Sequence, residues 1–315
     1  MQLVTYLAGP TPRLGAVWHD VVLDLRNLSL DVAAQRQARP PRDALLPTSM
    51  IELIEAGPEA WARAQTVWDY GRGLVDRLDP ADLRRRRVGR PLGRTRLLAP
   101  IPRPRKNIFC MGRNYAEHAA ERGAVPPEHP VFFTKAPTTV IGPEAAIVHH
   151  ALTQALDYEV ELAVVIGRGG RDLTPGEALG HVFGYTILND VTARDLQKNH
   201  QQWFKGKSLD TFCPMGPVLA TADEIPDPQG LGIRLRVNGQ TRQDATTGQM
   251  IFDVATLLSV LSAGLTLEPA DILATGTPSG VGAATGAYLK AGDVVEAEVD
   301  GIGCLVNRVV APAEA

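Results

Sequence analysis

The chain has 315 residues, of which 44% are hydrophobic and 21% charged, and its net charge is −3. This composition is typical of a globular protein with one large domain or two ordinary ones, and the charge excludes a general attraction to nucleic acid or to anionic membranes. Three widely separated cysteines, Cys110, Cys213 and Cys304, exclude a disulfide framework and a paired-cysteine metal site.

The N-terminus has no basic start followed by a long apolar stretch, and no apolar run approaches the length of a membrane span. We therefore expect no signal peptide and no membrane contact. The cysteine pattern fits a reducing compartment, so the expected location is the cytoplasm.

The first 95 residues predict a small α+β unit. Residues 1–30 alternate apolar and polar positions between turns, which predicts an antiparallel β unit. Residues 48–78 predict helix, with Thr48 or Ser49 as the cap and Glu52 after it. Residues 79–106 are rich in Pro, Gly and Arg and predict a boundary, so the basic run LRRRRVGR is interpreted as a solvated linker rather than a nucleic-acid contact.

The remainder, residues 96–315, predicts a strand-rich catalytic domain without internal repeats. RNYAEHAAERG predicts a helix that Gly123 ends, and helical patterns recur near 192–200 and 253–263. The other apolar stretches predict strands: KNIFCMG, VFFTKAP, TTVIGP, LDYEVELAVVIG, HVFGYTILND, GPVLA, IRLRVNG, DILATG, DVVEAEVDGIG and CLVNRVV.

One of these strands, LDYEVELAVVIG (156–167), carries Asp157, Glu159 and Glu161 at alternate positions. Alternation places the three acids on one face, where they repel each other unless a positive charge lies among them. One interpretation is a solvent-facing strand paired with basic neighbours. The other is a site for a hard cation such as Mg²⁺ or Mn²⁺.

Three further segments contain candidate chemistry. In GYTILNDVTARDLQ, Asp190 ends a strand and either delivers a ligand to a pocket or, like Thr192, caps the next helix. WFKGKSLDTFCPMGP is not a phosphate-binding P-loop, because the glycine required at 201 is Gln201. ATGTPSGVGAATG is either a loop that approaches ligand or an ordinary turn cluster.

His118 and Glu121 are three residues apart in the predicted helix and therefore lie on one face. A carboxylate that fixes a histidine tautomer is a common way to make a general base. The alternative is an ordinary surface pair.

Taken in order, DYEVELAVVIG, GYTILNDVTARDLQ, WFKGKSLDTFCPMGP and ATGTPSGVG resemble the fumarylacetoacetate hydrolase superfamily. The resemblance covers about residues 105–310 and implies a strand-rich α+β catalytic domain of the mixed β-sandwich or β-roll type. It also implies a homodimer and an accessory domain in the first 95 residues.

Carried over residue by residue, the resemblance implies an Mg²⁺ or Mn²⁺ site with Asp157 behind the ligands and a lid over residues 113–127. The implied metal ligands are Glu159, Glu161 and Asp190, and the implied catalytic residues are His118, Glu121 and Lys207. The implied substrate contacts are Arg113, Tyr115, Gln197, Lys207 and Thr277 or Thr275. The family often has Lys-Pro where this chain has Lys135-Ala136-Pro137, so Lys135 is assigned to the structure or the rim.

The implied reaction is hydrolysis of a C–C bond in an acylpyruvate-like or fumarylacetoacetate-like diketo acid, through an enolate that the metal stabilises. The alternative is decarboxylation of oxaloacetate or of an aromatic-catabolism intermediate, or isomerisation of a 2-hydroxy-dienedioate. These reactions share one intermediate, so the motifs do not separate them. A binding module without catalysis is the remaining alternative.

Overall fold

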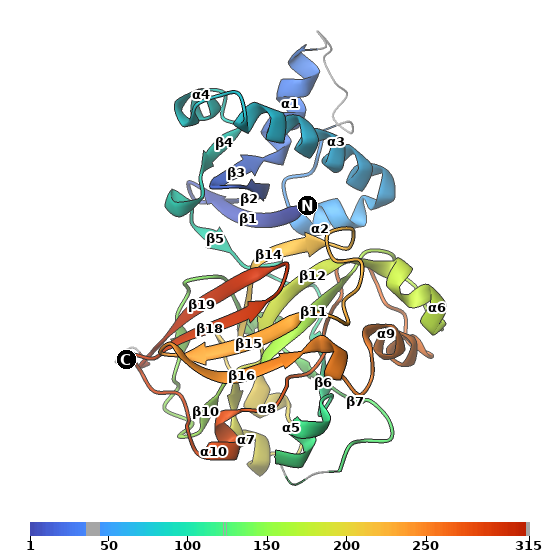
Figure 1. Ribbon diagram of the computed structural model, residues 1–315, viewed down its shortest axis with the longest axis vertical. Helices are drawn as coiled ribbons and strands as arrows, with labels where there is room; N and C mark the ends of the chain where they lie inside the picture. Colours follow the sequence, from blue (N-terminus) through green and yellow to red (C-terminus); the bar gives the residue numbers. More distant parts are fainter. Residues whose placement is uncertain (36–44, 122, 124, 313–315) are drawn as a thin grey trace.

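The computed structural model describes residues 1–35, 45–121, 123 and 125–312. Its N-terminal part is a short antiparallel sheet covered by helices (Figure 1). The strands are β1 (Gln2–Ala8), β2 (Thr11–Trp18), β3 (Val21–Asp24), β4 (Gly89–Pro91) and β5 (Leu97–Leu98). The helices are α1 (Leu25–Gln35), α2 (Met50–Glu55), α3 (Gly57–Val75) and α4 (Pro80–Arg85).

Local sequence explains where these helices begin. Ser49 caps α2, and a capping box with Glu52 satisfies amides of the first turn, as predicted. Asp79 caps α4, and Pro80 occupies a position in the first turn where no amide is needed.

The prediction of a solvated linker over 83–90 is wrong. The segment 83–90 begins in α4 and ends in β4, which pairs with β3. Leu83 and Val88 are buried, so apolar contacts between the arginines tie this segment to the core. The composition suggested a linker because Leu83 and Val88 are single apolar residues separated by four arginines.

The rest of the chain is built mainly from strands, with short helices between them. The strands are β6 (Ile108–Gly112), β7 (Val131–Lys135), β8 (Val140–Ile141), β9 (Ile147–Val148), β10 (Leu156–Asp157), β11 (Val160–Ile166), β12 (Val182–Asn189), β13 (Thr192–Ala193), β14 (Cys213–Thr221), β15 (Gly232–Val237), β16 (Gln240–Thr246), β17 (Ile272–Ala274), β18 (Val294–Val299) and β19 (Gly303–Val310). The helices are α5 (Ala116–Glu121), α6 (Pro175–Ala178), α7 (Arg194–Asn199), α8 (Phe204–Lys207), α9 (Val254–Ser262) and α10 (Gly282–Thr285).

A 12-stranded sheet in the order β4-β3-β2-β1-β14-β12-β11-β17-β6-β7 joins both parts of the chain, with β5 beside β1 and β8 beside β14. A 5-stranded sheet in the order β16-β15-β18-β19-β9 packs against it, and β10 pairs with β13. The strand-rich α+β class is confirmed. The boundary between residues 95 and 96 stays a prediction, because the pairing of β1 with β14 continues the sheet across it.

Strand β11 lies at the centre of this arrangement and is buried along its whole length. Its even-numbered residues, such as Leu162 and Val164, belong to one apolar core. Ala163 and Val165 belong to a second core, which includes the N-terminal helices. Burial on both faces explains the continuous apolar run, and it places Glu161 on the face that continues into the second core.

No helix among the described residues is long and apolar enough to cross a membrane.

Candidate active site

Three carboxylates meet where β11 begins and β12 ends. The antiparallel register pairs Val160 with Asn189. Glu159 and Glu161 are the chain neighbours of Val160, and Asp190 is the residue after Asn189, so the pairing brings the three acids together. The Asp190 amide donates to the Glu159 carbonyl at 2.8 Å, and the Glu159 amide donates to Asn189 Oδ1 at 3.0 Å. One oxygen atom from each of the three carboxylates lies within 4.8 Å of the others, and all three residues are buried.

Three cationic side chains surround this cluster. Lys207 Nζ lies 2.6 Å from Glu159 Oε2 and 2.7 Å from Asp190 Oδ2. Arg194 donates to Glu159 Oε1 at 2.5 Å, and Lys135 Nζ donates to Asp190 Oδ1 at 2.5 Å. The solvent-facing interpretation of the acidic strand is therefore wrong, because both sets of charges are buried.

The pKa values of the two glutamates of the cluster are shifted in opposite directions. Burial alone would raise the pKa of Glu159, but the nearby charges of Arg194 and Lys207 overcome it and hold that pKa far below its ordinary value. Burial and the negative charges of Asp190 and Glu159 raise the pKa of Glu161 well above its ordinary value. Among the described residues, Glu161 forms no ion pair, and the charge of Lys207 offsets this rise only in part.

The donor set fits a hard divalent cation. When all are ionised, the four buried carboxylates Asp157, Glu159, Glu161 and Asp190 outnumber the three buried cations Lys135, Arg194 and Lys207 by one negative charge. Carboxylate oxygens are the ligands that Mg²⁺ and Mn²⁺ prefer. An added cation would favour the ionised form of Glu161 and so lower its raised pKa. Glu159, Glu161 and Asp190 can therefore hold a metal ion, as the sequence predicted.

Asp157 supports the cluster without joining it. Its side chain is fully buried and accepts hydrogen bonds from the backbone amides of Gly282 at 2.7 Å and Ala283 at 2.9 Å. Its Oδ2 also accepts a bond from Arg194 Nε at 2.8 Å. Asp157 therefore orients the guanidinium that reaches Glu159, which agrees with its predicted place behind the ligands.

Helices α7 and α8 bring Arg194 and Lys207 into the cluster. They pack closely at Gly206, where an added Cβ would lie 2.5 Å from the Gln197 amide nitrogen. This contact explains the glycine in the Gly-Lys-Ser sequence that superficially resembles a P-loop. Thr192 does not cap α7; it lies in β13 and donates to the Asp190 carbonyl.

His118 and Glu121 form a pair in α5, with His118 buried, Glu121 partly buried, and His118 Nδ1 2.8 Å from Glu121 Oε1. Glu121 Oε2 accepts a second bond from the Gly280 amide at 2.9 Å. Partial burial alone would raise the pKa of Glu121, but these hydrogen bonds lower it below the ordinary value. An ionised Glu121 can only accept, so Nδ1 is the donor in this pair, and in a neutral imidazole this tautomer has its lone pair on Nε2.

The glycine-rich loop approaches the site, so it is not an ordinary turn cluster. The Gly276 amide donates to Glu161 Oε2 at 2.8 Å from a backbone φ of 97°, a conformation that favours glycine. Thr277 lines the cavity, whereas Thr275 is fully buried and donates to the Leu162 carbonyl. Of the two threonines, Thr277 is therefore the one that lines the cavity.

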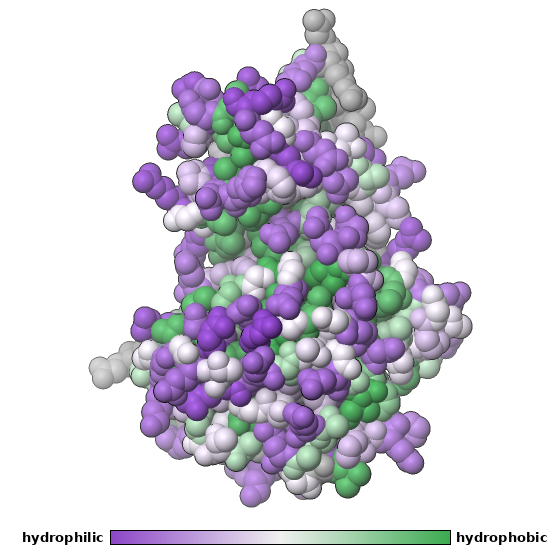
Figure 2. Space-filling model, in the orientation of Figure 1, coloured by the Kyte–Doolittle hydropathy of each residue, from purple (hydrophilic) through white to green (hydrophobic). Residues whose placement is uncertain are grey.

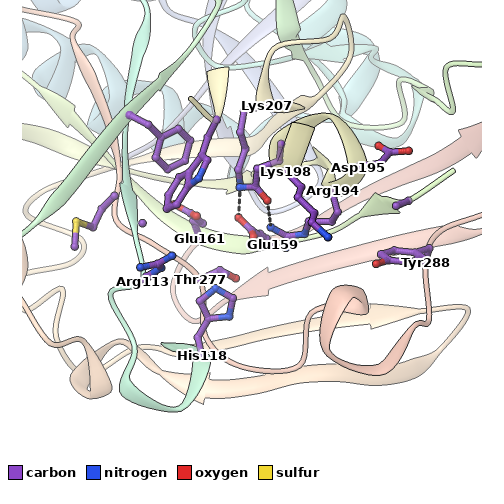
Figure 3. A pocket seen from close by; sticks show the side chains of 16 residues that line it. Arg113, His118, Glu159, Glu161, Arg194, Asp195, Lys198, Lys207, Thr277 and Tyr288 are labelled. Atoms are coloured by element: carbon purple, nitrogen blue, oxygen red, sulfur yellow. Dashed lines mark hydrogen bonds and ion pairs between the residues drawn. The ribbon is translucent and has the colours of Figure 1, made fainter. Parts of the chain in front are cut away.

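These elements enclose a cavity of about 510 Å³. Figure 3 shows Arg113 and His118 opposite Glu159, Glu161 and Lys207. Arg113 lies 5.7 Å from the Trp203 ring, and Gln197 accepts a bond from Arg194. Further lining comes from Phe133, Lys198 and Tyr288.

Most of the residues predicted from the sequence meet in or beside this cavity. Tyr115 differs, because it is buried behind the cavity and its hydroxyl has no hydrogen-bond partner among the described residues. Lys135 is not on the rim but fully buried against Asp190. The sequence analysis did not identify Arg194, although three acids at alternate positions of one strand require positive charges close to them.

Residues 107–310 match the family described as Fumarylacetoacetate (FAA) hydrolase C-terminal. The oxaloacetate tautomerase YisK of Bacillus subtilis is 46% identical over 269 residues, which span 84% of this chain and 87% of that protein. A crystallised fumarylacetoacetate hydrolase from Exiguobacterium antarcticum is 41% identical with a TM-score of 0.80, covering 99% of this chain and all of that chain. A 2-hydroxyhepta-2,4-diene-1,7-dioate isomerase from Mycobacterium marinum is 30% identical with a TM-score of 0.72, covering both chains fully.

Proposed function

Because this chain belongs to the fumarylacetoacetate hydrolase family and is one of its enzymes, we propose that it interconverts the keto and enol forms of oxaloacetate or a closely related 2-oxo dicarboxylic acid. The observation that carries the proposal is a single cavity lined by both a histidine with a fixed tautomer and a carboxylate cluster suited to a divalent cation. The similarity to an oxaloacetate tautomerase supports oxaloacetate as the substrate.

The proposed chemistry is a proton transfer. His118 Nε2 takes a proton from the methylene carbon, and Glu121 stabilises the imidazolium that forms. The electron pair moves to the 2-oxo oxygen, which takes up a proton to complete the enol, and the imidazolium gives up the proton it took from carbon, directly or through water, so that no net proton is gained. Bound Mg²⁺ or Mn²⁺ would act as a Lewis acid toward the developing negative charge.

Cationic residues suit the two carboxylates of the substrate. Lys207 donates hydrogen bonds to Glu159 and Asp190 and also lines the cavity. Its positive charge therefore lies at the end of the cavity where the carboxylate cluster is (Figure 3). Arg113 and Lys198 line the cavity, and neither pairs with a carboxylate in the described part of the chain. We propose that these two side chains bind the second carboxylate of the substrate.

Hydrolysis of a diketo acid, the first reaction that the family resemblance implied, is the second candidate. The 41% identity to a fumarylacetoacetate hydrolase supports it. In this reaction His118 would activate water instead of taking a proton from carbon. Both candidates use the same residues, so the products must separate them.

The test is to dissolve enol oxaloacetate in buffer with Mg²⁺ and follow loss of the enol absorbance by stopped flow, with and without enzyme. Pyruvate release and acylpyruvate cleavage are measured in parallel. We expect faster loss of enol without matching pyruvate. Cleavage of an acylpyruvate with no effect on the enol would instead establish the hydrolase.

A further inference from the structure

A second cavity, of about 530 Å³, lies in the N-terminal part of the molecule where β2, β3, α1, α4 and β4 meet. None of its lining residues lines the catalytic cavity. Figure 1 shows α4 and β4 at the opposite end of the molecule from α5, α7 and α8. Its charged lining residues are Arg13, Asp24, Arg84, Arg87, Arg90 and Arg94.

These side chains make the cavity strongly positive. Five arginines against one aspartate leave a surplus of four positive charges. The chain as a whole is negative, so this charge is a local feature. Like charges in one cavity repel each other unless an anion lies between them.

The end of α4 divides the basic run between two environments. Arg85 and Arg86 pair with Asp82 and Asp31. Arg84 lies in the last turn of α4, and Arg87 follows the helix with a positive φ of 60° and an amide bonded to the Arg84 carbonyl. Both of these arginines line the cavity instead. In the part of the chain that the structure describes, no carboxylate pairs with Arg84, Arg87 or Arg94.

Part of the cavity is held in place before any ligand binds. Arg13 Nη2 lies 3.1 Å from both Asp24 Oδ1 and Asn27 Oδ1, and buried Asp24 also accepts the Tyr6 hydroxyl at 2.5 Å. The Arg90 guanidinium lies 5.1 Å from the Tyr6 ring centre. Fixed guanidinium groups lose little freedom on binding and contact phosphate or carboxylate groups in a two-pronged geometry.

We propose that this cavity binds a small polyanion, a metabolite with several phosphate or carboxylate groups. The described residues that line it include no aromatic ring on which a nucleobase would stack, which argues against a nucleic acid. Its volume matches a compact ligand. The basic run therefore forms a binding site, whatever reaction the distant catalytic cavity performs.

The test is isothermal titration of the full chain with pyrophosphate and with citrate, at low ionic strength and without added divalent ions. The double variant Arg87→Gln/Arg94→Gln should bind at least about tenfold more weakly than wild type, because each arginine supplies charge-assisted hydrogen bonds. The matched control, Arg63→Gln, removes an exposed arginine of α3 and should bind like wild type. Tighter binding of pyrophosphate indicates a phosphorylated ligand, and tighter binding of citrate a polycarboxylate.

Thermal melting provides a second measurement, since a ligand of the native state raises the melting temperature. Each anion that binds should raise it in wild type and Arg63→Gln but not in the double variant. Three results would overturn the proposal: equal binding by the double variant, no binding of either anion at millimolar concentration, or tighter binding of a single-stranded oligonucleotide at the same arginines.

Discussion

Replacing Glu121 by Gln tests whether the carboxylate sets the tautomer of His118. Glu121 accepts two hydrogen bonds, from His118 Nδ1 and from the Gly280 amide. These bonds go to different carboxylate oxygens, and the single oxygen of a glutamine cannot occupy both positions. When that oxygen faces Gly280, the amide NH₂ faces Nδ1 and forces the imidazole proton onto Nε2, where it blocks the base.

The size of the effect follows from these contacts. Keeping the active tautomer would leave a donor without an acceptor, at a cost of about 1–3 kcal/mol, which corresponds to a loss of roughly 5–150-fold in rate. Loss of the negative charge beside the imidazolium adds to this. The total loss in rate should be larger than the loss from the tautomer alone but no larger than the full general-base contribution, about 10²–10⁴-fold.

The assay is the enol-oxaloacetate reaction in stopped flow, with ¹⁵N NMR of the imidazole as an independent reading of the tautomer. We expect kcat to fall with little change in KM. Glu117→Gln is the matched control, because Glu117 lies in the same helix, is exposed and contacts Ser279. An unchanged kcat in Glu121→Gln, or an equal fall in the control, would refute the role assigned to the pair.

Glu159→Gln should weaken divalent-ion binding and abolish activity, since a neutral amide replaces a charged hard ligand; full activity in EDTA-treated wild type would contradict this. Lys135→Met should lower the free energy of unfolding by about 3 kcal/mol in urea denaturation, because it removes one buried partner of Asp190. The control Lys106→Met, at a half-exposed ion pair, should cost at most about 1 kcal/mol. The folded-state pKa of Glu121 is lowered, so its charge stabilises the fold above its unfolded pKa of about 4.3 and that contribution is lost as the pH falls further; the stability difference between wild type and Glu121→Gln should therefore shrink in acid. The predicted homodimer should scatter light as a particle of twice 33.9 kDa, and a stable monomer at micromolar concentration would contradict it.

The sequence predicted the main strands well because their apolar patterns are long and bounded by turn residues. It placed β11 and β12 within a few residues and gave Thr48 or Ser49 as a helix cap, of which Ser49 is the cap in the structure. Short elements such as β13 and α8 were missed, and the strand predicted over 156–167 is in fact the two strands β10 and β11, because two to four residues carry no periodicity. Their form depends on partners distant in the chain.

The candidate metal cluster could also be found from the sequence. Alternation placed Glu159 and Glu161 on one face, and the resemblance supplied Asp190. What this reasoning lacked was the buried cations, because Lys135 and Arg194 reach the acids from separate elements. No local pattern marks a lysine as buried, since its burial depends on the charges that tertiary folding brings to it.

The sequence by itself therefore determined the strand-rich class, the acidic strand and the histidine–glutamate spacing, all of which depend on residues close together in the chain. Only the tertiary structure decided which cations neutralise the acids, which threonine of the glycine-rich loop lines the cavity, and that the basic run encloses a second cavity. The physical reason is that hydrophobic periodicity is a local property. Electrostatic balance is not, because it depends on distances between side chains that only the folded sheet brings together.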